Sequence, residues 1–171
     1  MIIEEVIGSR TDFSDPGTET DLLELEWYET TRRIQRKKTN SGMEIAIRLL
    51  REGQRLRQDD VLYHDGNKIV VVYVKPCDAI VLRPLSMLEM GTVCYEIGNK
   101  HLPLFIQDQE VLMPFEAPMF RWLEAAGYRP EKGERQLKNL LKSNVEPHSH
   151  GNSGPSLFTR IMNLAGSKQE S

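Results

Sequence analysis

The positions of the histidines in this chain suggest that it binds a metal ion. Three of the four histidines fall in two places, at His101 and at the pair His148 and His150. Neutral imidazole binds Ni(II), Zn(II) and Cu(II) well, but such metals usually need at least about three side-chain donors. We therefore expect a metal held at His101 to take further ligands from His148 and His150, from a symmetry-related copy of the chain, or from both.

His101 is predicted to follow the end of a helix. Apolar residues recur at spacings of three and four until Gly98 and Asn99 interrupt the pattern; they are Met87, Met90, Val93, Cys94 and Ile97. The free carbonyl groups at a helix C-terminus carry partial negative charge, which favours a nearby cation. The position therefore suits either a charged imidazole or a bound metal ion.

The other two candidate ligands lie in a segment with little tendency to fold. Serine, asparagine, glycine and proline are frequent between positions 143 and 155. We therefore expect residues 147–171 to form a flexible tail that carries His148 and His150. An ordinary solvated segment is the alternative for this pair, and His64, next to Asp65 and Gly66, is predicted to be a turn residue.

The second half of the chain has the element order of a ferredoxin-like domain. The sequence patterns predict strands at 79–82, 104–106, 111–113 and 128–136, and helices at 86–98 and 119–126. Ser86 and Glu89 fit a capping box at the start of the first helix, and Gly127 fits the end of the second. The resulting β-α-β-β-α-β order is ferredoxin-like.

The first part of the chain is predicted to be β-rich. Alternating apolar and polar residues indicate strands at 23–27 and 43–49, with further strands at 61–63 and 69–74. Turn sequences lie at 39–42 and 65–67. The predicted fold class is therefore α+β, with a small all-β, sandwich-like N-terminal domain at 1–75, a ferredoxin-like domain at 76–146 and the flexible tail at 147–171.

The segment Tyr95-Glu96-Ile97-Gly98-Asn99-Lys100-His101, followed by Leu102-Pro103-Leu104, resembles the signature of the UreE family, whose members are nickel metallochaperones for urease. The resemblance covers residues 1 to about 146 and includes Leu25-Glu26-Trp27 and Pro114-Phe115-Glu116-Ala117-Pro118. Lys100 stands where the family commonly has arginine, which keeps the charge but loses the planar guanidinium.

The resemblance implies a function as well as a fold. It implies a head-to-head homodimer formed by the second domain, with His101 of two subunits as the primary Ni(II) site and His148 and His150 completing it. Zn(II) or Cu(II) would compete at the same site. The cargo would reach the urease apoprotein through the accessory GTPase UreG and its associated accessory proteins. Some members have histidines soon after the motif, where this chain has Gln107, Asp108 and Gln109.

A basic run supplies the main alternative function, a non-enzymatic module that binds protein or RNA. Its residues are Arg32, Arg33, Arg36, Lys37 and Lys38. Such a run can grip phosphates, dock a protein partner, or simply keep a sheet edge solvated. Acidic residues surround it, which favours the solvated edge, then protein docking, with nucleic acid last.

Composition and motifs limit the remaining classes. The formal net charge is −3, which gives no broad reason to expect nucleic acid or an anionic membrane as partner. No run approaches the roughly 18 apolar residues of a membrane span, and the start lacks a signal peptide, so the cytoplasm is expected. Cys77 and Cys94 are predicted to be reduced thiols. Glu96 and His101 could act as acid and base, but nothing supplies a nucleophile, so no enzymatic activity is expected.

Overall fold

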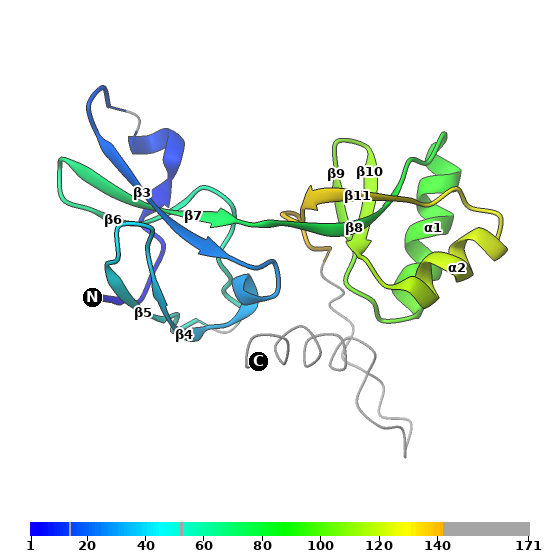
Figure 1. The fold of residues 1–171 in the computed structure, drawn as a ribbon, viewed down its shortest axis with the longest axis horizontal. Coiled ribbons are helices and arrows are strands. Elements are labelled where there is room, and N and C mark those ends of the chain that lie inside the picture. Colours follow the sequence, from blue (N-terminus) through cyan, green and yellow to red (C-terminus); the bar gives the residue numbers. More distant parts are fainter. Residues whose placement is uncertain (14, 52, 142–171) are drawn as a thin grey trace, which may run out of the picture. The chain divides into compact units, whose positions relative to one another are not determined.

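The computed structural model describes residues 1–13, 15–51 and 53–141, and the chain divides into two compact units. The first unit is Met1–Pro76 and the second begins at Cys77 (Figure 1). The first is built from strands and the second from strands and two α-helices. The predicted α+β class, with a β-rich domain followed by a ferredoxin-like domain, is confirmed. The predicted tail at 147–171 lies outside the described residues.

Two sheets make up the first unit. One has the order β1-β5-β4 and the other the order β2-β6-β7-β3. Pairing is antiparallel except between β1 and β5 and between β3 and β7, which are parallel. The elements are β1 (Ile2–Ile3), β2 (Gly8–Ser9), η1 (Arg10–Phe13), β3 (Glu19–Leu25), η2 (Glu29–Thr31), β4 (Ile34–Lys38), β5 (Glu44–Arg48), β6 (Asp60–His64) and β7 (Lys68–Val74).

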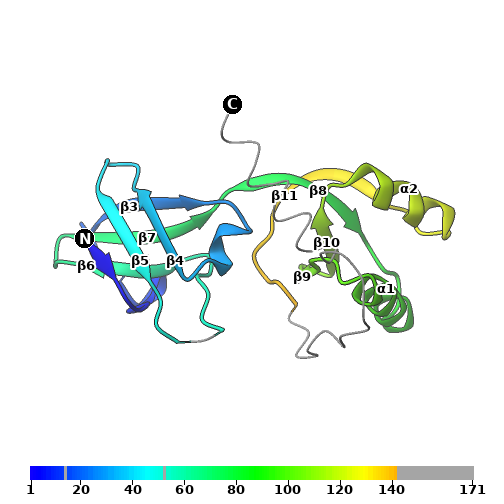
Figure 2. The same cartoon turned by 90° about the horizontal axis from the view of Figure 1, so that it is seen from below.

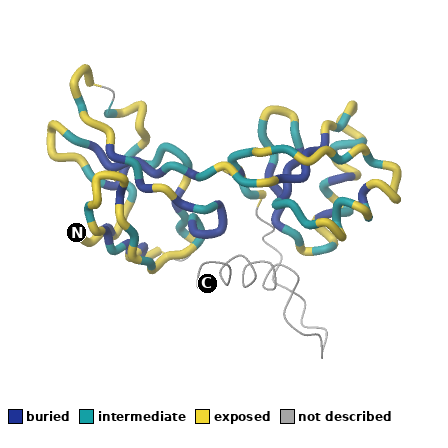
Figure 3. The backbone as a smooth tube through the Cα atoms, viewed as in Figure 1, coloured by how far each residue is buried: buried dark blue, intermediate teal, exposed yellow. Residues whose placement is uncertain are grey.

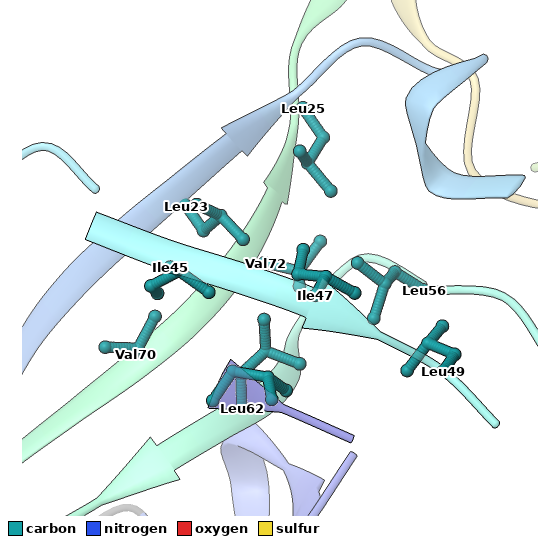
Figure 4. Close-up of a cluster of buried hydrophobic side chains, with 10 residues drawn as sticks. Leu23, Leu25, Ile45, Ile47, Leu49, Leu56, Leu62, Val70 and Val72 are labelled. Atoms are coloured by element: carbon teal, nitrogen blue, oxygen red, sulfur yellow. The ribbon is translucent and has the colours of Figure 1, made fainter. Parts of the chain in front are cut away.

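The core of the first unit lies between the two sheets. Alternate residues of β3, β5 and β7 turn inward, as the period-two pattern requires. Figure 4 shows these side chains converging from the crossing strands; they include Leu23, Leu25, Ile45, Ile47, Leu56, Leu62, Val70 and Val72. The other face of β7 is also covered, because Ile69 and Val71 pack with Val61, Phe13 and Leu22. Strand β7 is thus buried on both faces.

One detail of the predicted β pattern was wrong. The strand expected at 23–27 ends at Leu25, since a turn follows in which the Glu29 carboxylate accepts the backbone N–H of Glu26 and the Thr30 hydroxyl donates to the Trp27 carbonyl. Trp27 is still buried, but beyond the strand. The turn predicted at 39–42 connects β4 to β5, and Arg36, Lys37 and Lys38 of the basic run belong to β4.

The second unit is a four-stranded sheet with two helices on one face. The strand order is β11-β8-β10-β9. Side chains of α1 and α2, including Val93, Ile97 and Leu123, pack on the sheet residues Ile80, Leu82, Val111 and Met113. The elements are β8 (Pro76–Leu82), α1 (Met87–Asn99), β9 (Phe105–Gln107), β10 (Glu110–Pro114), α2 (Ala117–Ala125) and β11 (Glu131–Gln136). Each unit thus has buried residues of its own (Figure 3).

The helix ends follow the predicted chemistry with small shifts. The Ser86 hydroxyl accepts the backbone N–H of Glu89, and the Glu89 carboxylate accepts the N–H of Leu85, one residue earlier than a capping box requires. Helix α2 begins two residues before the predicted start, because Pro118 is tolerated in a first turn. Gly127 ends α2 with φ of +87°, a conformation that glycine adopts without strain.

Candidate metal site

Helix α1 presents His101 at its C-terminal end, as predicted. Lys100 is the C-cap residue, and the backbone N–H of His101 donates to the carbonyl oxygen of Gly98 at 2.9 Å. His101 is exposed, with φ of +54°. This left-handed conformation is uncommon for residues other than glycine, and histidine is among those that accept it more often. The imidazole of His101 therefore lies on the protein surface, just beyond the end of α1.

Contacts on both sides fix the backbone at His101. The Lys100 ammonium lies 4.0 Å from the centroid of the Trp122 ring, which belongs to α2. One turn earlier, the Tyr128 hydroxyl donates to the Glu96 carboxylate at 2.9 Å. Beyond the histidine, Leu104 is 3% exposed. The ligand candidate therefore sits on an anchored part of the chain, although it is itself exposed.

One face of α1 carries exposed apolar side chains. Met87 is 87% exposed, Leu88 81% and Tyr95 71%. Gly91 and Gly98 lie on the same face, and a Cβ added at either would meet nothing within 4 Å. Each glycine costs the helix about 1 kcal/mol relative to alanine. This face, defined by Met87, Leu88, Gly91, Tyr95 and Gly98, ends beside His101.

The C-terminal end of the described chain lies beside the segment that follows His101. The backbone N–H of Leu141 donates to the carbonyl oxygen of Leu104 at 2.7 Å, and that of Ile106 donates to Asn139 at 3.3 Å. The Gln107 amide donates to the Gln136 carbonyl at 2.9 Å and accepts the N–H of Lys138 at 3.2 Å. The open edge of β9 is thereby covered, and the chain is held there up to Leu141.

The structure places the remaining predicted residues in different ways. His148 and His150 lie outside the described residues. His64 is exposed at the end of β6, before the turn at 65–67, and its ring packs on Phe13 with 5.1 Å between centroids. Glu96, considered as a partner of His101, is bonded to Tyr128 instead. Cys77 and Cys94 do not form a disulfide with each other.

Two further observations concern the described ranges 1–13, 15–51 and 53–141. Within them, no three His, Cys, Asp or Glu side chains form a group that could hold a metal. Over the same ranges, no helix is both long and apolar enough to cross a membrane.

The hydrogen bonds of Gln107 were not predicted from the sequence. No local pattern marks a side chain that bonds to backbone about 30 residues away.

Fold and surface together define a two-domain protein in which a ferredoxin-like domain exposes its histidine at a helix end. Residues 3–75 match the family model described as UreE urease accessory protein, N-terminal domain. The urease accessory protein UreE of Flavobacterium johnsoniae is 57% identical over 165 residues, which cover 96% of this chain and 99% of the relative.

Two more relatives agree. The UreE of a Haemophilus influenzae strain is 46% identical over 84% of this chain and 80% of its own length. The UreE of Acetivibrio thermocellus is 40% identical over 90% of this chain and 99% of its own. The chain belongs to the UreE family of urease accessory proteins. It is an accessory protein and not an enzyme.

Proposed function

We propose that this chain is a nickel metallochaperone that binds Ni(II) at His101 and delivers it for assembly of the urease active site. The observation that carries the proposal is an exposed histidine, held by an anchored helix end, in a member of the urease accessory family. Ni(II) accepts imidazole ligands readily. An exposed site allows the ion to be exchanged with a recipient.

The primary site in this proposal is shared by two subunits. A two-fold interface brings the same residue of each subunit together, so two His101 side chains can bind one ion. The exposed face of α1 supports such an interface, because it combines apolar side chains with two glycines that permit close approach. Burying this face in a homodimer would remove apolar surface from water and place both helix ends at the two-fold axis.

His148 and His150 complete the metal shell in this proposal. His148 is seven residues beyond Leu141, and seven residues span at most about 25 Å. Leu141 is bonded to Leu104, which follows His101 by three residues, so its N–H lies within roughly 15 Å of the His101 backbone. The tail histidines can therefore reach the ion, and their tethering gives an effective concentration of about millimolar.

The cargo and partners follow the family. Zn(II) and Cu(II) also bind imidazole and are expected to compete at the same site. The proposed recipients are the accessory GTPase UreG and, with it, the urease apoprotein and its other accessory proteins. The cytoplasm is the proposed compartment. Neither nucleic acid nor a membrane takes part.

Calorimetric titration with Ni(II) tests the proposal. The wild type is expected to bind about one ion per dimer tightly, and His101→Asn is expected to abolish that binding. Asparagine is the better substitution because it tolerates the left-handed backbone, whereas alanine adds strain. His148→Ala/His150→Ala should only weaken binding. Tight binding by His101→Asn, or none by the wild type, would refute the carrier model.

A further inference from the structure

The outer face of the sheet β1-β5-β4 exposes apolar side chains that the proposed metal site does not use. Ile34 on β4 is 76% exposed, Ile2 on β1 is 68% exposed and Met1 is 45% exposed. Figure 2 shows this sheet in front of the strands β3, β6 and β7, with its outer face toward the viewer. Large apolar residues are thus gathered on one side of the first unit, opposite its buried core.

The same face carries two residues of the basic run, Arg36 and Lys38, together with Arg48 of β5. Cross-strand partners share a face of the sheet, and the register pairs Ile34 with Arg48, Arg36 with Ala46 and Lys38 with Glu44. Exposed Arg36, Lys38 and Arg48 therefore stand around the isoleucines. Lys37 points elsewhere, because its ammonium bonds to the buried Glu29 carboxylate.

Two of these cations lack an acidic partner in the described part of the chain. Lys38 is paired with Glu44 at 3.1 Å. Within the described ranges, neither Arg36 nor Arg48 has a carboxylate oxygen within 4.0 Å. Two guanidinium groups are therefore available to a ligand on a protein whose formal net charge is −3. The positive charge is local to this face.

A cleft of about 580 Å³ lies beside Arg36 and Lys38, and its lining does not include Arg48 or Ile34. Its apolar lining includes Met1, Ile2 and Ala46, and its charged lining residues are Arg36, Lys37, Lys38 and Glu44, of which Glu44 is paired with Lys38. The N-terminal ammonium of Met1 donates to the Glu44 carbonyl at 3.0 Å, so it adds positive charge beside the cleft. The surface thus offers both apolar contact and cationic hydrogen-bond donors.

We infer that this face docks an acidic, extended segment of a partner protein, whose carboxylates bind Arg36 and Arg48 while its apolar side chains cover Ile2 and Ile34. Residues two apart on β4 are spaced at about 6.6 to 7 Å, which is also the repeat of one face of an extended peptide. Arginine binds carboxylates with two parallel hydrogen bonds. A peptide in which acidic and apolar residues alternate at every second position presents both kinds of side chain on one face, and it therefore fits the charge and the spacing.

A solvated sheet edge or a nucleic-acid site would account for only part of this surface. Charged residues on an edge strand can simply discourage aggregation, but Ile34 and Ile2, exposed on the same face, would promote it. Single-stranded nucleic acid binds through aromatic side chains on which bases stack, and the residues that line this cleft are aliphatic or charged. Protein docking accounts for both the apolar and the basic residues.

Fluorescence anisotropy tests the inference with three labelled probes. They are the octapeptide Glu-Ser-Val-Ser-Glu-Ser-Val-Ser, which carries glutamate and valine on one face when extended, a matched peptide with lysine in place of glutamate, and a 12-nucleotide poly-uridylate. The proteins are full-length wild type, Arg36→Glu/Arg48→Glu, and Arg121→Glu/Lys138→Glu as a control with the same charge change on exposed residues of the second unit. Nickel titration and thermal unfolding of each variant check that the fold and the metal site are intact.

The glutamate peptide is expected to bind wild type and control equally, and the Arg36→Glu/Arg48→Glu protein at least tenfold more weakly. If that variant does not fold, Arg36→Gln/Arg48→Gln should show a several-fold loss. Equal binding of the glutamate and lysine peptides, or no loss on charge reversal, would overturn the inference. Tighter binding of poly-uridylate, lost on charge reversal, would assign the face to nucleic acid instead.

Discussion

The backbone N–H of Leu141 donates to the carbonyl oxygen of Leu104 at 2.7 Å, and Leu104 is three residues after His101. Two parts of the chain that are far apart in sequence are thus joined beside the candidate metal ligand. The bond covers the open edge of β9, which would otherwise offer unpaired backbone groups. It also fixes the point from which residues 142–171 continue.

Gln107→Ala should weaken Ni(II) binding by about three- to tenfold, because it frees the segment from Gln136 to Leu141 and lowers the effective concentration of the tail histidines. The Gln107 amide bonds to this segment twice, since it donates to the Gln136 carbonyl and accepts the backbone N–H of Lys138. Calorimetry measures the affinity, and hydrogen exchange of the Leu141 amide measures the release directly.

Two comparisons control this prediction. In a His148→Ala/His150→Ala background, Gln107→Ala should have no effect on Ni(II) affinity, because the tail then carries no ligand. Lys138→Ala should behave as wild type, since the backbone N–H that Gln107 accepts remains. An equal loss of affinity with and without the tail histidines would show that Gln107 acts through the stability of the domain.

Tyr95→Glu is expected to convert the proposed dimer into monomers. It places a charge on the exposed apolar face of α1, where burial against a second copy would leave the charge without a partner. Sedimentation velocity measures the change, and the Ni(II) affinity should fall with it. Leu50→Glu, which alters a 59% exposed residue of the first unit, is the matched control and should remain dimeric.

Local patterns predicted the elements but not their long-range contacts. The helix start at Ser86 and the histidine after α1 follow from caps and spacing over about ten residues. The parallel pairing of β1 with β5 and of β3 with β7 joins segments more than 40 residues apart, and alternation within a strand carries no information about its neighbour.

The candidate site likewise combines a feature that the sequence predicts with features that it does not. Its position on the chain was predicted from the motif, and the exposure of His101 agrees with it. The left-handed backbone of His101 and the stacking of Lys100 on Trp122 depend on how α1 packs against α2. Such features arise from tertiary packing, which a pattern along the chain does not specify.

Lys100→Gln should destabilise the second unit by about 0.5–1 kcal/mol, the usual contribution of an exposed cation–π contact. Lys100→Arg should not, because a guanidinium also packs on the Trp122 ring. Urea unfolding compares the two variants. Faster amide exchange at His101 in Lys100→Gln alone would show that the contact also holds the end of α1. Identical behaviour of the two variants would mean that the ammonium contributes nothing there.

Asp21 gives the first unit a stability that depends on pH. Burial alone would raise the pKa of this carboxyl, but hydrogen bonds from Ser41 and Thr39 and the Lys68 ammonium outweigh it and lower the pKa from 3.8 to about 2. Asp21 is 3% exposed. The backbone N–H of Ser41 lies 2.9 Å from one carboxylate oxygen, and the Lys68 ammonium lies 3.2 Å from the other.

Because the pKa of Asp21 is lowered in the folded state, its contribution to stability decreases as the pH falls. The stabilisation is fully present above pH 3.8 and is lost as the pH falls toward 2, because protonation then favours the unfolded chain. Asp21→Asn should therefore lower the free energy of unfolding by about 2 kcal/mol at pH 6, and the difference from wild type should shrink by roughly 1 kcal/mol at pH 3.

Urea unfolding followed by Trp27 fluorescence in a Trp122→Phe background measures this difference within the first unit. Asp15→Asn removes the same charge from an exposed residue and should leave the free energy of unfolding unchanged at both pH values. A difference between wild type and Asp21→Asn that stays constant from pH 6 to pH 3 would show that Asp21 stabilises the unit through its shape and neutral hydrogen bonds. In that case, the charge held by Lys68 and Ser41 would not be the source of the stability.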